Sequence, residues 1–147
     1  HARTLTLSPD GDLLSGEEVL IAVAARDKLL FDQSMRRQGL QGFSCKFRFH
    51  LHPEIVVRIH PTGGQAVLIL PNSETWTLST DATVKLALES SVYLERQALQ
   101  PRATKQVVLS QSAISYATRI NWVLTRTRPP EQLRRERDHE MRYAIQT

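Results

Sequence analysis

The chain has 147 residues, of which 41% are hydrophobic and 23% charged, which is typical of one globular domain that buries its own core. Its net charge of +4 is a mild basic excess, and nucleic-acid-binding domains usually concentrate more charge than this on one face. No run of about 18 apolar residues is present, so the sequence predicts no membrane-spanning helix. Cys45 is the only cysteine, which excludes an intrachain disulfide and a cysteine-based zinc site.

The N-terminal region begins directly with an alternating pattern. Residues 2–7 predict a strand, and the turn residues Ser8-Pro9-Asp10-Gly11 follow. Because the first residue is His1 and not Met, we expect a piece of a longer protein, with a removed signal peptide as the alternative. A second strand is predicted over 13–23, interrupted around Ser15-Gly16, with a short helix over 17–26 as the weaker alternative. Residues 24–42 show little periodicity and predict a long, partly mobile connection.

The clearest strand pattern lies over residues 45–52. Alternate side chains of a strand point to opposite faces of a sheet. One face is apolar and consists of Cys45, Phe47, Phe49 and Leu51. The other carries cationic or titratable groups, namely Lys46, Arg48, His50 and His52. Pro53 ends the strand or marks a sheet edge.

Further short strands follow at intervals of roughly ten residues. They are predicted over 55–59, 65–70, 74–79, 83–88, 91–94, 106–110 and 119–125, and the apolar 65–70 segment is expected to be central in its sheet. No helical pattern separates these segments, so parallel crossovers are not expected. The sequence therefore predicts an all-β fold, an antiparallel two-sheet β-sandwich over residues 1–127. Residues 128–147 are dense in charge and predict a short helical or disordered tail.

The outward row of Lys46, Arg48, His50 and His52 is the first candidate for a binding site. Its groups lie about 7 Å apart along one face, a spacing that could follow the charges of an anionic polysaccharide. The alternative is an ordinary solvated strand face, which general exposure statistics favour. No nucleic-acid or membrane partner is predicted.

Other side chains have both a functional and a structural interpretation. His50 and His52 resemble a zinc-binding pair, but the further candidates His60, Glu54 and Asp81 have no informative spacing, so we predict no metal site. The proton-donor candidates Tyr93 and Tyr116 are more simply explained by packing, and so are the possible sugar-stacking residues Trp76 and Trp122.

Several stretches in this order resemble the C-terminal portion of bacterial heparinase II/III-like proteins. They are His1-Ala2-Arg3-Thr4-Leu5-Thr6-Leu7-Ser8, Asp10-Gly11, Leu14, Gly16-Glu17, Arg48-Phe49-His50-Leu51-His52-Pro53, Trp76, Ser91-Val92-Tyr93, Pro101-Arg102, Thr104, Gln106-Val107-Val108-Leu109, Asn121-Trp122, Leu124 and Arg126. The resemblance covers about residues 1 to 126, and the order of the stretches carries it.

This resemblance implies a parent polysaccharide lyase with an N-terminal α-helical toroid, which cleaves uronic-acid-containing polymers by β-elimination. The proton-transferring groups and a metal site would then lie upstream of His1, so no catalytic residue and no cofactor is assigned to this chain. The predicted partners are the toroid of the same protein and an acidic polysaccharide. The resemblance leaves a bacterial periplasm and a bacterial cytoplasm open as locations.

Three hypotheses about function follow. In the first, the domain supports a lyase site in the parent protein and contacts anionic glycan, while being inactive alone. In the second, it binds anionic glycan without chemistry. In the third, it is a structural domain that packs against a neighbouring one.

Overall fold

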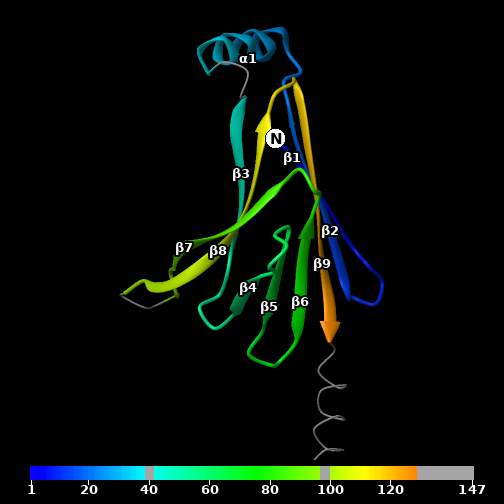
Figure 1. The fold of residues 1–147 in the computed structure, drawn as a ribbon, viewed down its shortest axis with the longest axis vertical. Helices are drawn as coiled ribbons and strands as arrows, with labels where there is room; N and C mark the ends of the chain where they lie inside the picture. The colour runs from blue at the N-terminus through cyan, green and yellow to red at the C-terminus, as the bar shows by residue number, and fades with distance from the viewer. Residues whose placement is uncertain (39–41, 97–99, 129–147) are drawn as a thin grey trace, which may run out of the picture.

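The computed structural model describes residues 1–38, 42–96 and 100–128. The elements are β1 (Ala2–Leu7), β2 (Leu13–Ile21), α1 (Ala25–Gln38), β3 (Phe43–His50), β4 (Val56–Ile59), β5 (Gln65–Ile69), β6 (Thr75–Thr80), β7 (Lys85–Tyr93), β8 (Arg102–Ala113) and β9 (Ala117–Arg128). The strands form a six-stranded sheet in the order β1-β2-β9-β6-β5-β4 and a three-stranded sheet in the order β3-β8-β7, and all pairings are antiparallel. The predicted antiparallel all-β sandwich is confirmed (Figure 1).

The core lies between the two sheets and is built by strand alternation. On β9, Ile120 and Trp122 are buried; on β8, Val107 and Leu109 are buried. Phe47 from β3 packs with these residues, and half-buried Trp76 packs against the same cluster. The predicted burial is therefore confirmed for Trp122, whereas Trp76 is only half-buried. Removing this apolar surface from water is the main favourable term that holds the sheets together.

Two strand predictions differ from the structure in more than the positions of their ends. β2 passes through Ser15 and Gly16 without interruption, because β1 and β9 pair with it on both sides and Trp122 fills the space beside Gly16. The strands predicted over 83–88 and 91–94 form one strand, β7, because β8 pairs with it continuously from Lys85 to Tyr93. β5, which was expected to be central, lies between β4 and β6 and is one strand from the edge of its sheet. The tail predicted over 128–147 lies outside the described residues, except that Arg128 ends β9.

The prediction of a long mobile connection over 24–42 is wrong for most of its length, because α1 occupies Ala25–Gln38. Phe31 anchors this helix by packing against Phe43 and Tyr116, with ring centroids 5.3 and 5.4 Å away. Figure 1 shows α1 lying across one end of the sandwich, beyond the start of β3. Tertiary contacts therefore stabilise a helix whose own apolar periodicity is weak. No helix in the described ranges is long and apolar enough to cross a membrane.

Candidate functional site

The predicted basic row lies on the outer face of the three-stranded sheet. Lys46, Arg48 and His50 alternate with the core-facing residues of β3, and all three are exposed. His52 follows the end of β3 and is half-buried, so it does not continue the row in the same way. The structure thus brings together three of the four predicted residues on one face.

Lys46 forms an ion pair with a carboxylate on the opposite edge strand of this sheet. Its Nζ lies 3.1 Å from Oε1 of Glu89 on β7, and the Nε2 of Gln106 on β8 donates to the other oxygen at 3.3 Å. The hydrogen bond from Lys46 lowers the pKa of Glu89 below its usual value. The charge of Lys46 is therefore partly offset before any ligand arrives.

The side chains of His50 and His52 contact different partners. Nδ1 of His50 lies 2.8 Å from the hydroxyl of Ser91. The His52 ring packs edge-on against Tyr93, with centroids 4.8 Å apart, and its Nδ1 accepts a 3.3 Å hydrogen bond from the backbone N–H of Glu54. Within the described parts of the chain, no group of three or more His, Cys, Asp or Glu is placed to share a metal ion. The zinc-pair interpretation therefore has no geometric support.

Two further cations, Arg48 and Lys85, lie on this face, and the charge of Arg48 contributes to the lowered pKa of Glu89. Arg48 is exposed, and no ion pair involves it among the residues that the structure describes. Lys85 on β7 lies in the cross-strand row that continues through Ser110 to Lys46. Val108 pairs with Arg48 on this same face and is fully buried, while Arg48 itself is exposed. Arg48 and Lys85 are thus the residues best placed to meet an anionic ligand.

A buried ionic cluster on the other sheet was not predicted from the sequence. Glu18 on β2 is completely buried and faces the core. Its carboxylate accepts hydrogen bonds from Arg3 Nε at 2.6 Å and Trp122 Nε1 at 3.2 Å, and it lies 2.7 Å from His1 Nε2. The signal that could have found it is the turn over residues 8–11, which sets Arg3 opposite Glu18 in the β1–β2 hairpin. Through its contacts with Arg3 and His1, Glu18 holds β1 against β2.

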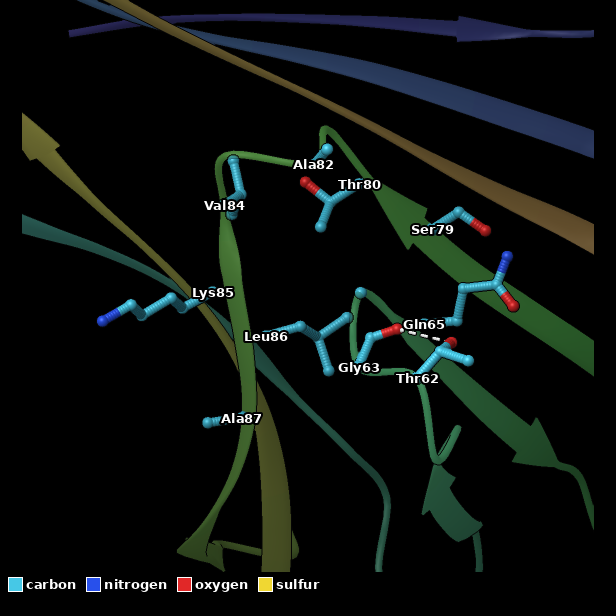
Figure 2. A pocket seen from close by; sticks show the side chains of 11 residues that line it. Thr62, Gly63, Gln65, Ser79, Thr80, Ala82, Val84, Lys85, Leu86 and Ala87 are labelled. Atoms are coloured by element: carbon cyan, nitrogen blue, oxygen red, sulfur yellow. Dashed lines mark hydrogen bonds between the residues drawn. The ribbon is translucent and has the colours of Figure 1, made fainter.

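A hollow lies between the β4–β5 turn, β6 and β7. It has a volume of about 830 Å³ and is lined mainly by hydroxyl, amide and small side chains from the β4–β5 turn, β6 and β7. Figure 2 shows Leu86 pointing toward Gly63 and Thr62, whereas Lys85 and Ala87 point away from them. The hollow contains none of the four residues of the predicted basic row; Lys85 is among its lining residues, but its amino group points away from the hollow (Figure 2).

The two tyrosines have packing roles, as the structural interpretation predicted. The Tyr116 hydroxyl donates to the Asp32 carboxylate of α1 at 2.9 Å, and this hydrogen bond raises the pKa of Tyr116. Lys28 Nζ lies 5.6 Å from the centre of the same ring. Tyr93 packs against His52. Tyr116 therefore helps to hold α1 against the end of the sandwich.

Comparisons with known proteins identify the family of this chain. The family model described as "Heparinase II/III-like, C-terminal" matches residues 1–123. FtsZ-localized protein C of Caulobacter vibrioides (strain NA1000 / CB15N) is 30% identical over 126 residues. That match covers 86% of this chain but 20% of the relative, so the chain spans about a fifth of the length of that protein. On the family match, which covers nearly all of the sandwich, the chain belongs to the heparinase II/III-like family and represents its C-terminal domain.

Proposed function

We propose that this domain supports the active site of a polysaccharide lyase of which it is the C-terminal part, and that it contacts the acidic polymer through Arg48 and Lys85. The observation that carries the proposal is the family match over residues 1–123, together with an exposed arginine that is not engaged in an ion pair with any described residue. The upstream toroid would supply the groups that remove and return protons. In β-elimination, a base takes the C5 proton of the uronate and an acid protonates the leaving oxygen at C4.

The outer face supports a contact of modest strength. A guanidinium group binds a carboxylate or sulfate with two parallel hydrogen bonds, which an ammonium group cannot do. An exposed ion pair contributes about 0.2–1 kcal/mol, and this corresponds to roughly a 1.4- to 5-fold change in affinity. The face would therefore help to hold a polymer that is bound mainly elsewhere. The Lys46–Glu89 pair would contribute less, because its charges already offset each other.

The test uses the full-length protein and a panel of uronic-acid polymers. Formation of unsaturated uronides is followed by their ultraviolet absorbance, and KM and kcat are measured separately. We expect Arg48→Ala to raise KM roughly 1.4- to 5-fold with little change in kcat, because the residue binds polymer and does not transfer protons. Arg58→Ala is the matched control, since Arg58 is an exposed arginine on β4 of the other sheet.

The outcomes separate the three hypotheses. Absence of unsaturated products from every polymer, with salt-sensitive retention on the same polymers, would favour the non-catalytic binding module. Absence of both would favour a purely structural domain. Equal effects of Arg48→Ala and Arg58→Ala would remove the outer face of the three-stranded sheet from the proposal.

A second candidate function rests on the relative from Caulobacter, whose name states that it localises with FtsZ. We propose on this basis that the parent protein localises with FtsZ. A fluorescent fusion of the full-length protein, imaged together with FtsZ in the organism that encodes it, tests this candidate. A uniform distribution throughout the cell cycle would contradict it, and the result is independent of lyase activity.

A further inference from the structure

The six-stranded sheet extends beyond the three-stranded sheet that packs against it. Leu5 and Leu7 of β1 stand opposite Gly16 and Leu14 of β2, positions whose side of the sheet faces the core. Yet Leu5 is 54% exposed and Leu7 is 63% exposed. Every residue of β1 is exposed, so this strand contributes an apolar margin that the three-stranded sheet does not cover.

Leu7 continues an apolar row that runs into the interior. It pairs with Leu14, which pairs with Leu124, and both of these pack against the core. Leu14 and Leu124 also line an apolar cavity of about 390 Å³ between the sheets, together with Trp76. The margin and the cavity are therefore one continuous apolar surface that begins at β1 and ends inside the sandwich.

The margin also lies on a free sheet edge. β1 pairs with β2 on one side, and no other strand in the described parts of the chain pairs with its other side. Proteins usually protect such an edge with charges, proline or a covering segment, because an exposed apolar edge strand promotes aggregation. The only charged side chain within β1 is Arg3, which is bound to Glu18. β1 thus has the features of a strand that is covered in the complete protein.

The family and the order of the domains in it indicate which segment covers the apolar margin of β1. The matching family model describes a C-terminal domain, so the remainder of a family protein precedes β1. In the Caulobacter relative, the matched region is 20% of the length, which leaves about four fifths for other parts. A segment tethered directly to the start of β1 has an effective concentration in the millimolar range, far above that of a second copy in dilute solution.

We propose that the β1 margin, defined by Leu5 and Leu7, is the docking surface for the part of the same polypeptide that precedes β1. Apolar side chains of that part cover the two leucines and bury them as a shared core. The proposal rests on the family membership and on exposure within this domain. It does not depend on lyase activity or on the glycan contact.

The test measures thiol labelling by a maleimide in the full-length protein, read at the level of single peptides by mass spectrometry. Leu7→Cys and Leu5→Cys are compared with Val92→Cys and Val56→Cys, in a Cys45→Ser background. Val92 is 62% exposed and Val56 is 51% exposed, so the two controls match the two leucines closely. We expect labelling at positions 5 and 7 to be at least tenfold slower than at the matched controls.

Two outcomes would overturn the proposal. Labelling at positions 5 and 7 that is as fast as at the controls would mean that nothing covers the margin. Protection that disappears on dilution would mean that a second copy, and not the preceding polypeptide, is the occupant. As an independent readout, Leu7→Asp should lower the midpoint of thermal unfolding of the full-length protein, whereas Val92→Asp should leave it unchanged.

Discussion

The indole of Trp122 lies directly over Gly16, its cross-strand neighbour, and leaves no room there for a Cβ atom. The nearest atoms to such a Cβ would be Cε2, Cζ2 and Nε1 of the indole, which are held in place by the buried core and by the bond to Glu18. Glycine is therefore required at this position of β2 by close packing, and not by a turn.

We expect Gly16→Ala to destabilise the chain by about 1–2 kcal/mol. The overpacking cost of about 1–3 kcal/mol exceeds the gain of about 0.5–1 kcal/mol from replacing glycine inside a strand. Urea unfolding measures the difference. Trp122→Phe removes the crowded atoms, so Gly16→Ala should cost about 1 kcal/mol less in that background. The same cost in both backgrounds would show that the indole is not responsible.

Glu18 and Glu17 are adjacent in β2 and provide a matched pair. Glu18 is buried and serves three donors, whereas Glu17 contacts Arg119 at 3.2 Å on the exposed face. Glu18→Ala leaves the buried Trp122 N–H without a partner and releases Arg3, so we expect a loss of about 2–4 kcal/mol. Glu17→Ala should cost less than about 1 kcal/mol. Unfolding in urea gives both values.

Hydrogen exchange locates the effect of the Glu18 substitution. The β1 amides should exchange much faster in Glu18→Ala than in Glu17→Ala, because Arg3 and His1 tie β1 to Glu18. Uniform loss of protection over both sheets would instead indicate a general loss of stability. Unchanged amide exchange in β1 would contradict the role of Glu18 in holding β1 against β2.

The Lys46–Glu89 pair should contribute less to the stability of the folded chain at low pH. The pKa of Glu89 is lowered in the folded chain, chiefly by the hydrogen bond from Lys46. Its stabilising contribution is therefore present above the pKa of an unfolded glutamate, about 4.3, and is lost as the pH falls through the lower folded value. NMR titration should give a pKa for Glu89 below the ordinary glutamate value of about 4.3, and Lys46→Met should raise it toward that value. An unchanged pKa in Lys46→Met would show that Lys46 is not the cause.

The strand alternation made the sandwich predictable, because side chains such as Phe47 and Ile120 face the core at every second position. The outward direction of Arg48 followed from the same rule. The partners of these outward residues were not predictable, since Glu89 meets Lys46 only through the β3-β8-β7 strand order. Glu18 was missed for a related reason. A carboxylate beside apolar residues in a strand looks solvent-exposed until the β1–β2 register places Arg3 against it.

α1 was missed because its anchor is a single aromatic side chain. Leu29 and Leu30 precede Phe31, but both are more than half exposed, so the helix has no broad apolar stripe. A 14-residue helix is marginal by itself in water, and its stability must therefore come from Phe31 and from the Asp32–Tyr116 hydrogen bond.

We accordingly expect Phe31→Ala to release α1 from the end of the sandwich. The substitution removes the ring contacts with Phe43 and Tyr116 and should cost about 2 kcal/mol, less than for a fully buried phenylalanine because Phe31 is half-buried. Amide exchange in α1 should approach the rate of an unstructured peptide, while β8 and β9 stay protected. Leu30→Ala is the control, because Leu30 lies on the same helix and is 51% exposed. If Leu30→Ala accelerates exchange in α1 as much as Phe31→Ala does, docking of the helix does not depend specifically on the aromatic ring, because alanine does not lower helix propensity.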